Sequence, residues 1–436
     1  MSKKSFASGE NIIKNKIALI NGQVYFPEKN KLIKSNIVIE EGILKDVDYK
    51  GELNDFNAVD CKGKVISPGF LDLRSHFGEP GFEDKETLLT GSEAALSGGY
   101  TKVCMLPNTS PALDNPEIVE SLNSKSESIS VNIYPIGSIT KGMQGSELSE
   151  IALMFEKGIV AISDGVNCLQ NSQLMRNALE YAKMFNIPVI NHAEDIYLKN
   201  NGMANESFFS TKKGFPANPA ISESVIIYRD LEIASFIGGR LHIPHISTKE
   251  SVELVKRYKN RGLNITAEVS PHHIGLSEED LGSYNSQFKI APPLRSKEDR
   301  LSLIQGLKEG VIDCISSDHC PHRLEDKETD ILSAKSGVIS LESAFPYVYN
   351  ILSKNNFSIE NILKLFTINP SKVIDIDWIP LQIGKFADLN IFDPKIEWTF
   401  KSSDIYSKSQ NSALFGRSMR GKIEKIIHNG TLYKFD

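Results

Sequence analysis

The stretch Val311-Ile-Asp-Cys-Ile-Ser-Ser-Asp318-His-Cys-Pro-His322 decides the fold, because it ends a short apolar run with a carboxylate and two imidazoles. The pattern recurs: eight of the nine histidines lie at or just beyond the ends of short apolar runs. A parallel barrel gathers the carboxyl ends of its strands on one face, where distant residues converge on one cavity. The other stretches of this kind are Leu71-Asp-Leu-Arg-Ser-His76, Val160-Ala-Ile-Ser-Asp164, Val189-Ile-Asn-His192, Leu241-His-Ile-Pro-His245 and Val269-Ser-Pro-His-His273.

The middle of the chain alternates strand-like and helix-like segments. Between the strands, apolar residues recur at helical spacing, as in 171–185 and 249–261, where Thr248 is a predicted N-cap. Strand intervals of roughly 25 to 50 residues match the βαβ unit, and eight in a row predict a (β/α)8 barrel rather than an open sheet. The eight predicted strands are 65–72, 102–106, 131–136, 159–162, 188–190, 240–243, 264–269 and 311–315.

Both ends of the chain are rich in β-forming residues. Each end is too small to fold alone, so we expect the two to pair as one small β-sandwich beside the barrel. The predicted sandwich takes residues 1–67 and 378–436, and the predicted barrel takes residues 68–377. The β-rich segments are 17–25, 37–47, 58–66, 389–392, 423–428 and 432–435, with hairpin-type turns at Asn21-Gly22, Glu41-Gly42 and Asn429-Gly430.

Composition excludes several classes of partner. The 436 residues include 49 basic and 55 acidic ones, and there is no basic stripe of the kind that binds nucleic acid. No run approaches the roughly 18 apolar residues of a membrane span. The stretch Met1-Ser-Lys-Lys-Ser-Phe6 lacks the apolar core of a signal peptide. We therefore expect a cytoplasmic protein with no nucleic-acid or membrane partner.

Asp318 is the strongest single candidate for chemistry. A carboxylate at a strand end can bind a metal ion and also take a proton from the attacking water. The imidazoles of His76, His192 and His245 are weak evidence one by one, since a single histidine there is more often packed or capping. Residues three apart on a strand point to opposite faces, so we favour His245 over His242. Three imidazoles with carboxylates suit Zn²⁺ or a similar divalent cation.

A series of motifs runs through nearly the whole chain in a specific order and spacing. Together the motifs resemble those of the dihydroorotases of the bacterial class I type, in the amidohydrolase superfamily. The motifs are Pro68-Gly-Phe-Leu-Asp72, Gly78-Glu-Pro-Gly-Phe-Glu-Asp-Lys-Glu-Thr87, Gly98-Gly-Tyr-Thr101, Leu106-Pro-Asn-Thr109, His192-Ala-Glu194, His245-Ile-Ser-Thr248, Glu268-Val-Ser-Pro-His-His273, Pro292-Pro-Leu-Arg295, Ser317-Asp-His-Cys-Pro-His322, Gly384-Lys-Phe-Ala-Asp-Leu389 and Ile391-Phe-Asp-Pro394.

The resemblance implies a cyclic amide hydrolase that interconverts N-carbamoyl-L-aspartate and L-dihydroorotate in pyrimidine biosynthesis. In the family, Asp318 matches the catalytic acid and base, and Asn108 and His322 match substrate-binding residues. Asp164 is the only aspartate available to match a carboxylate that bridges two metals, although the usual doublet is shortened to Asp164-Gly165. The residues that match metal ligands are His76, Asp164, His192, His245 and Asp318.

The chain departs from the family in the first barrel strand. The family motif is His-x-His followed two residues later by Arg, whereas this chain has Arg74-Ser-His76-Phe-Gly78, and an expected Asn is Ala291. A guanidinium cannot be deprotonated at ordinary pH, so it should empty or weaken one metal position. We therefore expect one Zn²⁺ ion, with two as the alternative. We also expect Arg74 to bind the substrate carboxylate that Gly78 cannot reach.

Two classes of function stay open. The first is an active cyclic amidase with an altered metal centre, acting on a small-molecule substrate. The second is a catalytically silent dihydroorotase-like subunit that serves as a scaffold for aspartate transcarbamoylase. The persistence of His192, His245 and Asp318 favours activity. An allantoinase or hydantoinase is a third, weaker reading, since such relatives commonly use a carboxylated lysine that is not evident beside Asp164. We also expect a homo-oligomer.

Overall fold

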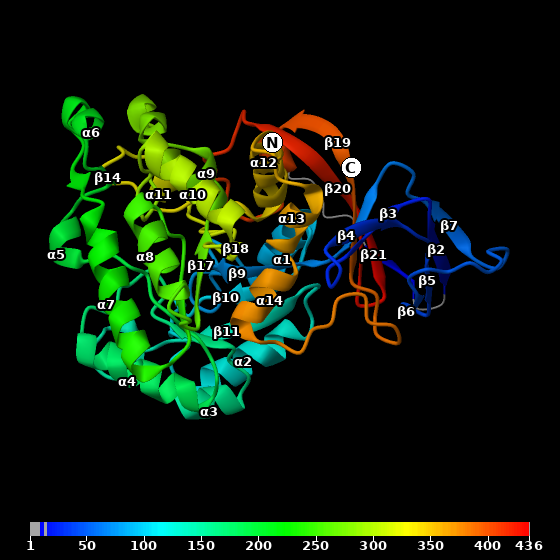
Figure 1. Ribbon diagram of the computed structural model, residues 1–436, viewed down its shortest axis with the longest axis horizontal. Coiled ribbons are helices and arrows are strands. Elements are labelled where there is room, and N and C mark those ends of the chain that lie inside the picture. The colour runs from blue at the N-terminus through cyan, green and yellow to red at the C-terminus, as the bar shows by residue number, and fades with distance from the viewer. Residues whose placement is uncertain (1–8, 13–14, 436) are drawn as a thin grey trace.

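The computed structural model describes residues 9–12 and 15–435 (Figure 1). Residues 1–8, 13–14 and 436 lie outside this description, and so does the stretch Met1–Phe6 on which the expected lack of a secretion signal rests. In the described ranges, no helix combines the length and the apolar character needed to cross a bilayer.

Eight parallel strands form the centre of the molecule. They are hydrogen-bonded in chain order, and a bridge between Ser75 and His319 joins the last strand region to the first. The prediction of a (β/α)8 barrel is therefore confirmed, and each predicted strand segment overlaps one of the observed strands. These are β9 (Phe70–Ser75), β10 (Tyr100–Met105), β11 (Asn132–Gly137), β12 (Ala161–Ser163), β13 (Val189–Ile190), β16 (Leu241–Ile243), β17 (Ile265–Val269) and β18 (Cys314–Ile315).

Helices surround this barrel (Figure 1). Thr248 caps α8 as predicted, because its side chain accepts a hydrogen bond from the backbone N–H of Ser251, and Gly98 ends α1. The helices are α1 (Leu88–Ser97), α2 (Pro116–Ser126), α3 (Ile151–Glu156), α4 (Ser172–Met184), α5 (Ile196–Lys199), α6 (Phe208–Lys213), α7 (Ile221–Ile237), α8 (Lys249–Lys259), α9 (Pro271–Gly275), α10 (Lys297–Glu309), α11 (Leu324–Lys327), α12 (Leu341–Lys354), α13 (Ile359–Lys364) and α14 (Ile368–Ile374).

The two ends of the chain meet in a β-sandwich at one side of the barrel, where blue and red strands lie together in Figure 1. One sheet has the order β1-β21-β20-β19-β8-β3-β4 and the other β6-β5-β2-β7. Leu19 and Ile39 from the N-terminal part share one buried core with Leu389 and Ile427 from the C-terminal part. The predicted sandwich is therefore confirmed. Its strands are β1 (Glu10–Asn11), β2 (Lys16–Ile20), β3 (Gln23–Phe26), β4 (Lys31–Lys34), β5 (Ile37–Glu40), β6 (Ile43–Asp46), β7 (Asn57–Asp60), β8 (Val65–Pro68), β19 (Leu389–Thr399), β20 (Ser418–His428) and β21 (Thr431–Lys434), and a separate pair is β14 (Ala204–Asn205) with β15 (Ala217–Asn218).

Two details of the strand prediction are wrong. The predicted strand 65–72 is two strands, because β8 pairs with β19 and β3 in the sandwich while β9 begins the barrel. Gly69 lies between them, where a Cβ would come within 2.1 Å of Thr101 Oγ1. Asn21-Gly22 is not a hairpin turn either, since β2 and β3 belong to different sheets. The hairpins at Glu41-Gly42 and Asn429-Gly430 are confirmed by the antiparallel pairs β5–β6 and β20–β21.

Candidate active site

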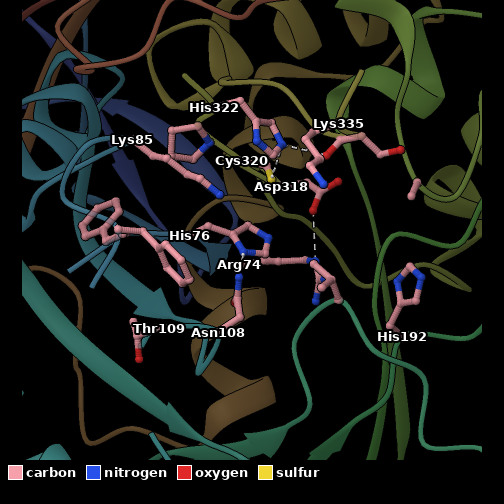
Figure 2. Close-up of a pocket in the computed structure, with 18 of the residues that line it drawn as sticks. Arg74, His76, Lys85, Asn108, Thr109, His192, Asp318, Cys320, His322 and Lys335 are labelled. Carbon is pink, nitrogen blue, oxygen red and sulfur yellow. Dashed lines mark hydrogen bonds and ion pairs between the residues drawn. The ribbon is translucent and has the colours of Figure 1, made fainter. Parts of the chain in front are cut away.

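A cavity of about 500 Å³ lies at the carboxyl ends of the barrel strands (Figure 2). This is the face on which barrel enzymes carry their catalytic residues. Most of the sequence-predicted site residues line it, whereas Asp164 and His245 do not. Its lining includes Arg74, His76, Lys85, Asn108, Thr109, His192, Lys199, Ala291, Asp318, Cys320, His322 and Lys335.

Arg74 and Asp318 form an ion pair inside the cavity. Arg74, near the end of β9, donates from Nε to Asp318 Oδ1 at 3.0 Å and from Nη2 to the carbonyl oxygen of Gly165 at 3.1 Å. Both side chains are buried, and Arg74 Nη1 has no hydrogen-bond partner among the described residues. Figure 2 shows the pair in the middle of the cavity, joined by a dashed line. The guanidinium expected to bind substrate is therefore also bonded to the candidate base.

His192 and His245, after β13 and β16, face each other on another side of the barrel mouth. His192 Nδ1 lies 3.0 Å from His245 Nε2, and His192 Nε2 lies 2.8 Å from Glu194 Oε2. Glu194 also accepts hydrogen bonds from Lys199 and, at 2.7 Å, from Asn218. Although burial opposes its ionisation, the hydrogen bonds and charges of His192 and Lys199 hold the pKa of Glu194 well below its ordinary value of 4.5. Glu194 is thus an anion that orients the His192 ring.

The remaining imidazoles of the site are neutral near pH 7. His76 Nδ1 contacts the side-chain amide of Asn108, 2.7 Å from Nδ2. Burial, and then the charge of Arg74, lowers the pKa of His76 well below 6.5. His322 Nε2 lies 2.8 Å from the carbonyl oxygen of Ser336, and burial lowers the pKa of His322 to about 4. Neutral rings here donate or accept hydrogen bonds without adding charge to the cavity.

Asp164 is placed elsewhere. Its carboxylate accepts hydrogen bonds from the backbone N–H groups of Ile139 and Thr140, both at 2.9 Å, and from Thr140 Oγ1 at 2.6 Å. It lines a neighbouring cavity together with Glu194. The structure therefore does not bring Asp164 to Asp318, and its carboxylate holds the loop that follows β11.

The donor set, as arranged, does not fit a divalent cation. In the described part of the chain, no three His, Cys, Asp or Glu side chains converge closely enough to hold a metal ion. The two ring nitrogens of His192 and His245 lie close together, but the carboxylate of Asp318 is bonded to Arg74. A fixed positive charge beside that carboxylate opposes a second cation there. The one Zn²⁺ ion expected from the sequence stays a prediction.

The cavity also contains charged residues to which the sequence reasoning gave no role. Lys85, Lys199 and Lys335 line it with Arg74, and Asp318 is the only carboxylate among the described lining residues. Neither Lys85 nor Lys335 makes a salt bridge within the described part of the chain. Lys85 was visible within a recognised motif, whereas nothing local in the sequence marks Lys335, which reaches the cavity from a loop. The excess of positive charge suits an anionic ligand.

The backbone at Gly78 leaves no room for a cationic side chain, so the lysines of the cavity are needed as a source of positive charge. A Cβ at this position would lie 2.2 Å from the carbonyl oxygen of Phe82, so the backbone has closed over the place where the sequence resemblance implies an arginine. A side chain at residue 78 has no room unless this backbone moves. Positive charge for a ligand carboxylate must therefore come from other residues.

Solved structures of hydantoinases have the same architecture. The L-hydantoinase (dihydropyrimidinase) from Arthrobacter aurescens superposes with a TM-score of 0.86, at 22% identity, over 97% of each chain. The D-hydantoinase (dihydropyrimidinase) from Thermus sp. superposes with a TM-score of 0.80, at 21% identity, over 95% of this chain and 94% of the other. At such identities the likeness shows the fold alone. The barrel with its β-sandwich is therefore the fold that this chain shares with the hydantoinases.

Sequence comparison then gives the family. The Dihydro-orotase-like family matches residues 63–251. The chain is 42% identical to the dihydroorotase of Caldicellulosiruptor saccharolyticus, over 96% of this chain and 99% of that protein. It is 36% identical to the dihydroorotase of Aquifex aeolicus, over 96% of this chain and 99% of that protein. The chain therefore belongs to the dihydroorotase family.

Proposed function

We propose that this chain is a dihydroorotase, which interconverts N-carbamoyl-L-aspartate and L-dihydroorotate in pyrimidine biosynthesis. The observation that carries the proposal is Asp318, a buried carboxylate at the barrel mouth in a cavity whose other charged lining residues are cationic. Full-length relatives named dihydroorotase support the choice of reaction. The substrates fit the charge of the site, since the cyclic form carries one carboxylate and the open form carries two.

The cavity residues have distinct tasks in this reaction. Arg74 Nη1, which has no protein acceptor among the described residues, can donate to an oxygen of the substrate. Asn108 and His322 offer neutral hydrogen-bonding groups at the cavity wall. Lys85 and Lys335 attract the anionic substrate toward the cavity. These contacts orient the ring amide against Asp318.

Asp318 moves the proton. During hydrolysis it takes a proton from the attacking water and returns it to the ring nitrogen as the C–N bond breaks, so no net proton stays on the enzyme. The Arg74 Nε–H bond to Oδ1 fixes the carboxylate and leaves Oδ2 for this transfer. The family is typically metal-dependent, and a bound metal ion would supply an activated water and a polarised carbonyl.

The test is a ring-opening assay on the purified full-length chain, with and without added Zn²⁺. We expect hydrolysis of L-dihydroorotate that Asp318→Asn removes. A wild-type chain that does not hydrolyse L-dihydroorotate in either condition overturns the proposal. The proposed enzyme acts on a small-molecule substrate. We also propose that it is a homo-oligomer and that it is located in the cytoplasm.

A second candidate is a catalytically silent subunit that binds the same ligand and serves as a scaffold for aspartate transcarbamoylase. The Arg74–Asp318 ion pair favours it, because one oxygen of the candidate base is already bonded to a guanidinium. Ligand binding without turnover, together with co-purification with aspartate transcarbamoylase, selects this candidate. A hydantoinase or allantoinase is not proposed, since the hydantoinase structures share only the fold.

A further inference from the structure

We infer that the Arg74 guanidinium takes the place of a divalent cation in this cavity, so that the site binds its anionic ligand without a metal ion. The choice of ligand rests on the proposed function: a ureido dicarboxylate, N-carbamoyl-L-aspartate. The inference itself concerns what supplies the positive charge. It is carried by the anchoring of Arg74, by the arrangement of the donors around it, and by the other cations of the cavity.

Arg74 is anchored at two of its three nitrogens, so its position is fixed. Nε is bonded to Asp318 and Nη2 to the backbone of Gly165, and the side chain is buried. The third nitrogen, Nη1, is buried without an acceptor among the described residues, and Arg74 lines the cavity. A buried donor of this kind is costly unless something satisfies it. An anionic oxygen of a ligand in the cavity meets that need.

The side chains around Arg74 that could bind a metal ion already form hydrogen bonds or ion pairs with other protein groups. His192 and His245 turn their ring nitrogens toward each other, and Glu194 is paired with both His192 and Lys199. The Asp318 carboxylate is paired with a guanidinium, which keeps its charge at any ordinary pH. A divalent ion that used Asp318 would have to displace a buried, doubly anchored cation. The ion pair therefore satisfies Asp318 in the way that a metal otherwise would.

Two further cations suit the second carboxylate of the ligand. Lys85 and Lys335 line the cavity and make no salt bridge within the described ranges, and Figure 2 shows both toward its His322 end. Lys85 lies 4.8 Å from the centre of the Phe82 ring, which holds its ammonium group near the wall. A dicarboxylate can thus place one group at Arg74 Nη1 and the other at these lysines, which replace the arginine that Gly78 excludes.

The first experiment needs no variant. The full-length chain is dialysed against a chelator, its zinc content is measured by elemental analysis, and N-carbamoyl-L-aspartate is titrated into it by calorimetry. We expect substoichiometric zinc and ligand binding that is the same before and after chelation. Zinc retained at one or more ions per chain, or binding that disappears on chelation and returns with added Zn²⁺, overturns the inference.

Variants of Arg74 test whether the guanidinium is the cause. Arg74→His, which replaces the cation with an imidazole donor, should gain zinc and lose metal-independent binding. Arg74→Lys keeps a charge but not the planar fork, so it should stay free of zinc and bind the ligand roughly 10- to 150-fold more weakly, the effect of one charge-assisted hydrogen bond. Arg257→His, on the exposed face of α8, is the matched control and should change neither quantity. Unchanged metal-independent binding in Arg74→His contradicts the inference.

These readouts separate the inference from the proposed function. Metal-independent binding without any turnover refutes the dihydroorotase proposal and leaves the inference standing. Turnover that requires stoichiometric Zn²⁺ supports the dihydroorotase proposal and refutes the inference.

Discussion

The two sides of the barrel mouth carry different chemistry on the same scaffold. On the side of β13 and β16, two imidazoles and Glu194 are bonded to one another in an arrangement that orients ring nitrogens. On the side of β9 and β18, a guanidinium is inserted beside the Asp318 carboxylate. The first side carries the polar set predicted for a metal-dependent hydrolase, and the second carries a fixed cation where the sequence resemblance predicts a metal donor.

The comparison shows that the backbone at the barrel mouth is held in place independently of the side chains that it carries there. The backbone N–H of His76 donates to the carbonyl oxygen of His319 at 2.9 Å, and Ser75 is bridged to His319. These contacts close the barrel whatever the side chain at position 74. A change of the side chain at position 74 can therefore alter the electrostatics of the site while the fold stays the same. Four variants can break or sharpen this comparison.

The largest effect is expected on the β18 side, from Asp318→Asn. Loss of the general base should lower kcat by a factor of about 10² to 10⁴. Steady-state hydrolysis of L-dihydroorotate measures it, and Asp55→Asn, an exposed aspartate of the sandwich, is the control. A variant that kept most of the wild-type kcat would remove Asp318 from the mechanism.

Arg74→Ala should act mainly on binding. One lost charge-assisted hydrogen bond of about 1.5 to 3 kcal/mol raises KM roughly 10- to 150-fold. The variant should still fold, because the Asp318 carboxylate that loses its partner faces the cavity and not the packed core. Steady-state kinetics measures KM, and a thermal melt checks that the variant is folded. An unchanged KM would show that Arg74 does not contact the substrate.

Glu194→Gln tests the side of β13 and β16 through the pH dependence of the free energy of unfolding. Because the pKa of Glu194 is held below 4.5, its ion pairs stabilise the folded state at pH 7, and that stabilisation is lost as the pH falls below about 4.5. The variant should therefore be less stable than the wild type by about 1.5 to 3 kcal/mol at pH 7, with the difference shrinking in acid. Denaturant unfolding at several pH values measures this. A difference that grew toward low pH would contradict the assignment of Glu194 as an anion.

The smallest effect should come from Lys335→Ala. Lys335 is exposed at the cavity, and exposed charges contribute about 0.2 to 1 kcal/mol, so the KM for L-dihydroorotate, whose one carboxylate is assigned to Arg74, should rise at most roughly fivefold. The increase should disappear at high salt, since screening weakens exposed charges. A KM effect that persisted in high salt would instead indicate a direct contact.

Much of the fold could be predicted from the sequence. Apolar runs of strand length at βαβ intervals predicted all eight barrel strands, and Thr248 was found as a cap because capping is local. The break at Gly69 was missed, because nothing in a continuous apolar run shows that its first half pairs with β19, more than 300 residues away. The hairpin prediction at Asn21-Gly22 was wrong for a similar reason, since a turn sequence does not show whether the two strands that it joins pair in one sheet.

The site could be predicted in part. Strand-end placement brought Arg74, His76, Asn108, His192, Asp318 and His322 to one cavity. It could not show that Asp164 turns to Ile139 and Thr140, because that depends on the loop after β11. It could not reveal the bond of Arg74 to Asp318 either, since the two are 244 positions apart and meet only when the barrel closes.

The most direct test of the central claim is a crystal structure of the full chain soaked with both Zn²⁺ and N-carbamoyl-L-aspartate, with data collected at the zinc absorption edge. The account predicts an intact Arg74–Asp318 ion pair, a ligand oxygen bonded to Arg74 Nη1, and no anomalous zinc peak within bonding distance of Asp318. A zinc ion bound to Asp318 with His192 and His245, and Arg74 turned away from it, would contradict the account.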